Sequence, residues 1–67
     1  MKNRKLYIVC FPHLEIVEGK TTLTGLLSVL PEILDIKYRT INQKLRNAKD
    51  NEIVKYKGGL FVRTSAN

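Results

Sequence analysis

The sequence has few of the residues from which disulfide frameworks, metal centres and nucleophilic active sites are built. Cys10 is the only cysteine among 67 residues, so no internal disulfide can form, and His13 is the only histidine. A Cys-x-x-His pair provides two ligands where a structural zinc ion needs four. No visible neighbour would make His13 part of a nucleophile–base pair. We therefore expect no metal site, no cofactor and no enzymatic activity.

Long apolar runs are absent as well. A basic start, residues 1–5, precedes an apolar run of only six residues, Leu6 to Phe11, which ends at Pro12. The pattern is similar to a secretory signal, but the run is too short for a signal sequence and far too short to span a bilayer. We interpret it as a β-strand behind a basic tail. Together with the missing disulfide, it favours a cytoplasmic protein without membrane contact.

A glycine-rich phosphate loop is also missing. The segment Gly19-Lys20-Thr21-Thr22 ends like a P-loop but has Leu14 where that motif needs a further glycine. Thr21 or Thr22 is better explained as the N-cap of a first helix that ends before Pro31. Within that helix, Gly25 predicts close approach of another backbone. One apolar stripe is expected along it, formed by Leu23, Leu26, Leu27 and Leu30.

Positive charge is concentrated in the second half of the chain, whose overall net charge is +6. Residues 1–35 contain four basic and four acidic side chains, whereas residues 36–67 contain eight basic and two acidic ones. A charge that served only solubility would not predict this clustering. The asymmetry indicates a polyanionic partner. The three tyrosines, Tyr7, Tyr38 and Tyr56, are better explained as edges of the core than as surface platforms on which single-stranded bases stack.

A second helix, expected over about residues 37–48, separates apolar from basic side chains. At about 100° per residue, one face is apolar and can pack on a core, and it consists of Tyr38, Ile41, Leu45 and Ala48. The opposite face contains only basic and amide side chains at its centre, namely Arg39, Gln43 and Arg46, flanked by Thr40, Asn42 and Asn47. This face carries no acidic residue, so it offers hydrogen-bond donors without opposing charge.

The remaining elements are strands. A return strand over residues 14–18 is expected to follow the first strand, and a β-hairpin is expected over residues 53–64. Its turn is predicted at the glycine pair 58–59, because glycine accepts positive φ. Strand alternation predicts that two lysines share the face opposite Val54 and Tyr56: Lys55 and Lys57. Residues 65–67 are expected to be a frayed tail.

The segment from Leu34 to Leu45 resembles the second half of a helix-turn-helix. Leu34-Asp35-Ile36 matches the turn, where glycine is usual at the second position, and Tyr38-Arg39-Thr40-Ile41 and Lys44-Leu45 match the helix that follows. Aspartate tolerates the left-handed backbone that such a turn needs. The likeness covers residues 22–48, or 22–64 with the hairpin counted as a wing. The family resembled is the small winged helix-turn-helix regulators of bacteria and phages.

The resemblance implies a single α+β winged helix-turn-helix domain over residues 1–67, with an N-terminal strand or hairpin, two to three short helices and a C-terminal hairpin wing. The implied function is sequence-specific binding of double-stranded DNA by a transcriptional regulator, with the helix at 37–48 in the major groove and the hairpin on phosphates. The expected DNA-contacting residues are Lys37, Arg39, Asn42, Gln43, Lys44, Arg46, Lys49, Lys55, Lys57 and Arg63. Because one small domain has limited area, a homodimer or tandem binding is expected.

Two other partners fit the same charge. A small protein-interaction module, such as a phage-encoded inhibitor, would use the basic surface to bind an acidic protein, because fold does not determine function. RNA is a third possible partner. A titration of random duplex DNA across a salt series separates DNA binding from the protein-partner alternative.

Overall fold

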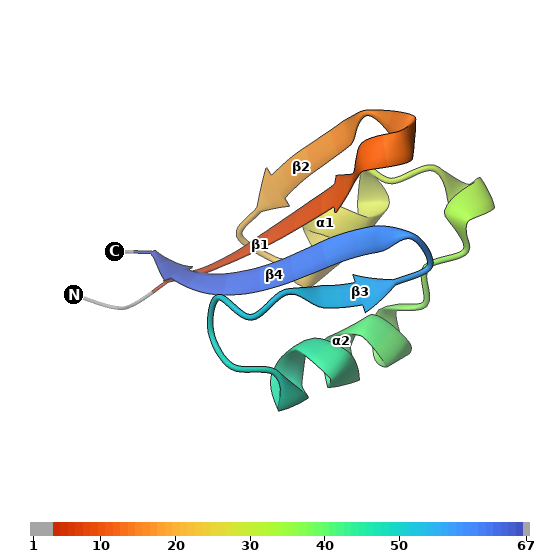
Figure 1. Cartoon of the computed structure of the whole chain (residues 1–67). Coiled ribbons are helices and arrows are strands. Elements are labelled where there is room, and N and C mark those ends of the chain that lie inside the picture. Colours follow the sequence, from red (N-terminus) through yellow and green to blue (C-terminus); the bar gives the residue numbers. More distant parts are fainter. Residues whose placement is uncertain (1–3, 67) are drawn as a thin grey trace.

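The computed structural model describes residues 4–66, which form a four-stranded antiparallel sheet with two α-helices (Figure 1). The strands are β1 (Arg4–Phe11), β2 (Ile16–Lys20), β3 (Val54–Tyr56) and β4 (Gly59–Ala66), and the helices are α1 (Leu23–Ser28) and α2 (Tyr38–Asn47). The strand order is β2-β1-β4-β3, so the first and last strands of the chain pair at the centre. The predicted α+β class is confirmed. None of the helices described is long and apolar enough to cross a membrane.

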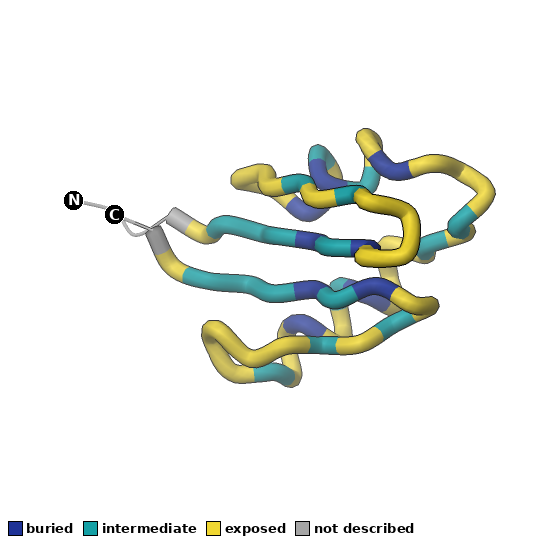
Figure 2. Tube along the Cα trace, turned by 45° about the horizontal axis from the view of Figure 1, so that its top comes forward, coloured by how far each residue is buried: buried dark blue, intermediate teal, exposed yellow. Residues whose placement is uncertain are grey.

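One face of the sheet forms the hydrophobic core with both helices. Val9 pairs directly with Phe61, and both are fully buried together with Phe11. The rings of Phe11 and Phe61 meet edge to face, with centroids 5.9 Å apart. The helices contribute four leucine and isoleucine side chains to the buried cluster, Leu23, Leu26, Ile41 and Leu45, and Leu30 joins it from the segment after α1. Figure 2 shows these buried positions on the central strands and the helices, with exposed loops around them.

The first helix begins as the sequence predicts. The Thr22 hydroxyl accepts a hydrogen bond from the Gly25 amide at 3.0 Å, so Thr22 is the N-cap. The helix ends at Ser28, two residues earlier than predicted, and the amides of Val29 and Leu30 bond three residues back. The predicted reason for Gly25 is wrong. Its missing Cβ would lie 2.8 Å from the Thr22 hydroxyl, so the close neighbour is the cap and not another backbone.

The chain reverses between the helices at Asp35. Residues Glu32–Leu34 form a 3-10 turn, preceded by Pro31 in an extended conformation. Asp35 then adopts a left-handed backbone with φ of 53°, as predicted for this aspartate. The resulting segment between α1 and α2 orients α2 so that Ile41 and Leu45 face the sheet. The predicted helix over 37–48 is shorter by one residue at each end.

The C-terminal hairpin differs from its prediction in three ways. Its turn lies at Lys57 and Gly58, with φ of 50° and 83°, and not at the glycine pair. Gly59 is the first residue of β4 and pairs with Tyr56, and only glycine fits there, because a Cβ would meet ring carbons of Phe11 at 2.5–2.9 Å. β4 also continues to Ala66, so the predicted frayed tail is wrong for residues 65–66. Residue 67 lies outside the described residues.

The N-terminal half of the sheet also corrects two predictions. The return strand runs over Ile16–Lys20 and not over 14–18, because a 3-10 turn at Pro12–Leu14 and a left-handed Glu15 intervene. The predicted basic tail over 1–5 is shorter, since Arg4 and Lys5 pair with β4 as part of β1. Residues 1–3 lie outside the described residues.

Candidate nucleic-acid interface

The two faces of α2 are as unlike as the sequence predicts. Ile41 and Leu45 are buried in the core, whereas Arg39, Gln43 and Arg46 are exposed. Tyr38 departs from its predicted place on the apolar face, because 49 % of its surface is exposed. It stands at the first turn of the helix, beyond the edge of the buried cluster. The apolar contacts of α2 therefore come from its middle, and they hold the basic face outward.

The exposed face of α2 carries a polar groove. Five side chains from three successive helical turns line it: Arg39, Asn42, Gln43, Arg46 and Asn47. A second groove on the same helix shares Arg39 and Gln43 and adds Thr40 and Lys44. Among the residues that the structure describes, no carboxylate pairs with Arg39, Lys44 or Arg46. The donors of this face are therefore available to an external acceptor.

At the N-terminal end of α2, a carboxylate holds two of the predicted DNA-contacting lysines. The Asp35 carboxylate lies 2.9 Å from the Lys37 ammonium and 3.4 Å from that of Lys57. Lys57 also donates to the Asp35 backbone carbonyl at 2.9 Å. The Lys37 hydrogen bond and the two positive charges hold the pKa of Asp35 below its ordinary value, and Asp35 raises the pKa of Lys37. Both lysines are thus engaged within the molecule.

At the C-terminal end of α2, Arg63 from β4 binds the chain that leaves the helix. Its guanidinium donates to the Ala48 carbonyl at 2.9 Å and to the Asp50 carboxylate at 3.2 Å, and its side chain is only 18 % exposed. The Ser65 hydroxyl also donates to Asp50, and Lys5 lies 3.7 Å from it. The Ser65 hydrogen bond and the charges of Lys5 and Arg63 lower the pKa of Asp50 against the opposing effect of partial desolvation. In this structure Arg63 is a connector between β4 and the end of α2.

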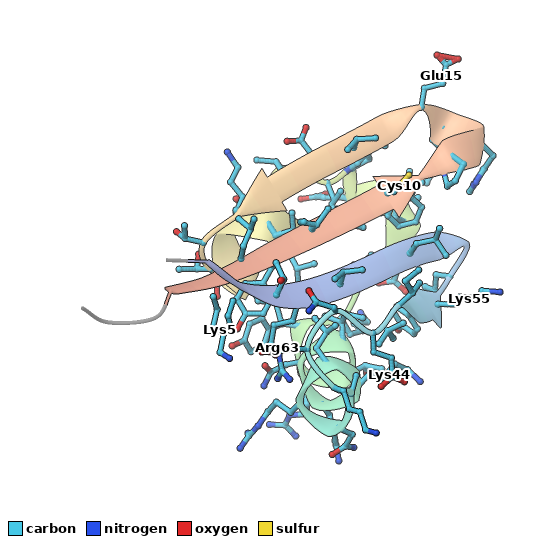
Figure 3. The ribbon with its side chains drawn as sticks, turned by 60° about the vertical axis from the view of Figure 1, so that its left-hand side comes forward. Lys5, Cys10, Glu15, Lys44, Lys55 and Arg63 are labelled. Atoms are coloured by element: carbon cyan, nitrogen blue, oxygen red, sulfur yellow. The ribbon has the colours of Figure 1, made fainter. Side chains whose placement is uncertain are left out.

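The two hairpin lysines do not share a face, contrary to the prediction. Lys55 lies opposite Leu60 in the β3–β4 pair, on the side of the sheet away from the core. Lys57 has left-handed backbone at the turn, and its ammonium reaches Asp35. In Figure 3, Lys44 projects from α2, Lys5 and Arg63 reach toward the α2 side, and Lys55 points away from that helix.

Lys44 and Lys49 complete the set of predicted residues. The Lys44 ammonium lies 5.7 Å from the centre of the Tyr56 ring, a distance that suits a cation–π contact. Lys49 is exposed in the loop after α2, where its amide donates to the Glu52 carboxylate at 2.9 Å. Of the ten predicted residues, the structure therefore gathers Arg39, Asn42, Gln43, Lys44 and Arg46 on one helix.

A scan against protein families and searches of curated proteins and solved structures find no match to this chain. Any proposal of function therefore rests on the geometry of the exposed α2 face. Within residues 4–66, no three histidine, cysteine or acidic side chains are grouped so that they could hold a metal ion. Cys10 is partly exposed on β1, and His13 is exposed beside the Phe11 ring.

Sequence reasoning missed a third polar groove, which lies next to α2. It lies between the N-terminal end of α1 and α2, and it is lined by Lys5, Tyr7, Thr21, Thr22, Leu23, Thr24, Tyr38 and Asn42. Asn42 lines both this groove and the one on the exposed helix face. The run of threonines before and within α1 is visible in the sequence, but only the fold brings Lys5 from the first strand beside it.

The exposed face of α2 has the dimensions and the donors for the major groove of DNA. A helix of ten residues is about 15 Å long, and the major groove, about 12 Å wide, admits one helix. Arginine can donate two hydrogen bonds to guanine, and asparagine or glutamine can pair with adenine. The first turn of α2 contains no acidic residue, and its N-cap residue makes no side-chain hydrogen bond, so the first amides, which point along the helix axis toward its N-terminal end, can donate to an external acceptor.

Proposed function

We propose that this protein binds double-stranded DNA, with α2 in the major groove, and acts as a sequence-specific regulator of transcription. The observation that carries the proposal is the grouping of Arg39, Asn42, Gln43 and Arg46 along one exposed helix face. Ile41 and Leu45 bury the opposite face in the core, so the helix presents its donors to solvent. A face of guanidinium and amide groups without carboxylates suits base edges and phosphates together.

The resemblance to winged helix-turn-helix regulators supports this proposal over α1, the left-handed turn at Asp35 and α2. The hairpin contributes differently from a free wing, because β4 is a central strand of the sheet. Lys57 is the hairpin lysine placed next to α2, through its contacts with Asp35. Lys57 is therefore proposed as a phosphate contact at the rim of the interface, and Lys55 as a contributor of charge only.

The proposal predicts that duplex binding depends on the α2 face and falls steeply with salt. A labelled random duplex should be titrated with the protein at low and at physiological salt. It should bind with micromolar affinity at low salt, and the affinity should fall at physiological salt, because salt cations compete with the protein's basic side chains for the phosphates. Arg39→Ala and Arg46→Ala should each lower the salt slope by about 1. Lys20→Ala, which removes an exposed lysine at the end of β2, is the matched control and should weaken binding much less.

Specific readout is tested separately by selecting a preferred duplex from a random pool. Gln43→Ala should then weaken the selected site by about 1–3 kcal/mol and leave random duplex almost unaffected, because only the base contact is lost. Absence of duplex binding by the folded parent at low salt would contradict the proposal. That outcome would favour an acidic protein as the partner of the same basic face.

A further inference from the structure

The sheet has a second face, which neither helix covers. On β1 and β4 the buried residues Val9 and Phe61 alternate with side chains that point to the opposite side. Directly paired residues share a face, so Ile8 lies beside Val62, and Cys10 beside Leu60. The apolar residues of this open sheet face are Leu6, Ile8, Cys10, Val17, Leu60 and Val62.

The open sheet face is more apolar than the solvent-exposed face of an antiparallel sheet usually is. An antiparallel sheet with one solvated face normally alternates apolar with polar residues along each strand. Here β1 is apolar on both faces from Leu6 to Phe11. Val17 is 70 % exposed, and the others are partly exposed. Among the positions whose side chains are described, the only charged one that shares this face is Lys55, on the edge strand β3.

This face is smaller than a stable interface needs. β1 and β4, of eight residues each, are about 26 Å long, β2 and β3 are shorter, and three strand spacings span about 14 Å. Two such faces in contact would therefore cover at most roughly 700 Å² of projected surface, below the about 1,200–2,000 Å² of accessible surface in stable complexes. An interface of this size predicts a weak association, with a dissociation constant between micromolar and millimolar.

We propose that the open sheet face binds the same face of a second copy of this chain. The distribution of charge supports a copy as the occupant. Apart from Lys55, the basic residues of positions 36–67 lie on α2 and at its two ends, or contact those ends, on the far side of the sheet. Sheets packed face to face lie about 10 Å apart, so the two α2 layers would be about 30 Å apart. That separation exceeds the screening length of about 8 Å at physiological salt, and repulsion between the copies is therefore weak.

A two-fold dimer also needs only one self-complementary patch, and a flat apolar face without central charge meets that requirement. An acidic partner would instead be attracted to the α2 side. In the dimer the two α2 faces would point in opposite directions. If the proposed function holds, one dimer would therefore bind two separate duplex segments, and not two half-sites on one straight duplex.

The dimer is tested first without DNA, by sedimentation from micromolar to millimolar protein. The parent should shift from monomer to dimer as concentration rises. Val62→Lys, which places a charge at the centre of the open sheet face, should stay monomeric. Ile33→Lys introduces the same charge on the 3-10 turn, where the side chain is 90 % exposed and away from the sheet, and should dimerise like the parent. A parent that remains monomeric at millimolar concentration would overturn the proposal.

Two further measurements distinguish loss of the dimer from loss of the fold. Circular dichroism shows whether Val62→Lys is folded; if it is not, Val17→Glu replaces it, because Val17 is already largely exposed. If both Val17→Glu and Val62→Lys are folded and still dimerise as the parent does, the proposal is contradicted. The reactivity of Cys10 toward a thiol reagent should also fall as the dimer forms, since this side chain lies on the proposed contact (Figure 3).

The two-duplex consequence has its own readout. A bead-bound duplex should capture a second, labelled duplex through the parent dimer, and Val62→Lys should abolish capture while still binding a single duplex. A dimer that forms without any duplex binding would refute the proposed function and leave the sheet-face dimer intact. Duplex binding by a parent that stays monomeric at millimolar concentration would refute the sheet-face dimer and leave the proposed function intact.

Discussion

The Asp35 carboxylate restrains two lysines at the edge of the proposed DNA surface, and its removal is the most informative single change. It lies 2.9 Å from the Lys37 ammonium and 3.4 Å from that of Lys57. Asp35→Asn removes the negative charge but keeps a residue that tolerates the left-handed backbone with φ of 53°. The turn between the helices should therefore keep its shape, while both ammonium groups lose their ionic partner.

The expected magnitude follows from counterion release. Each added phosphate contact steepens the dependence of log affinity on log salt by about 0.9, so two released lysines add up to about 1.8. Over a fourfold rise in salt, a slope difference of that size changes the ratio of affinities by about tenfold. Asp35→Asn should thus bind duplex DNA more tightly than the parent at low salt, and the advantage should shrink as salt rises.

Fluorescence anisotropy of a labelled random duplex, measured at several salt concentrations, checks this expectation. Glu32→Gln is the matched control, since it makes the same charge change in the adjacent 3-10 turn, and Glu32 pairs with no cation among the residues described. Equal slopes for Asp35→Asn and Glu32→Gln would show that the ion pairs with Asp35 do not matter. Weaker binding by Asp35→Asn would show that Asp35 positions the lysines for DNA.

Three further predictions concern stability. Leu45→Ala should cost about 2–5 kcal/mol in unfolding free energy, because it leaves a cavity under α2, and chemical denaturation measures this. Arg63→Ala should cost about 1.5–3 kcal/mol through its lost hydrogen bonds, whereas exposed Arg46→Ala should change stability by under about 0.5 kcal/mol; equal values would refute the connecting role of Arg63. The pKa values of Asp35 and Asp50 are lowered in the folded state, so their stabilisation is present above about pH 4 and is lost as pH falls through the lower folded-state values. Thermal melts between neutral and acid pH should show this loss, and Asp50→Asn should reduce it.

The sequence by itself determined the elements that depend on local chemistry. Thr22 caps α1 because a threonine before an apolar stripe can satisfy an orphan amide, and Asp35 turns left-handed because aspartate tolerates that backbone. The 3.6-residue period placed Ile41 and Leu45 on the buried face of α2, and Arg39 and Gln43 on the exposed one. These assignments need only a residue and its neighbours along the chain.

The tertiary structure decided what depends on residues distant in sequence. The hairpin turn lies at Lys57 and Gly58, whereas Gly59 belongs to β4, where the Phe11 ring leaves no room for a side chain. Arg63 became a connector because the fold places the end of α2 against β4.

The surroundings of the continuous apolar run from Leu6 to Phe11 also depend on residues distant in sequence. The sequence predicted a strand with much of both faces covered, and the structure covers one face with helices and leaves the other open. Periodicity identifies which side chains are apolar along a strand, whereas the pairing of β1 between β2 and β4 decides which surface they form.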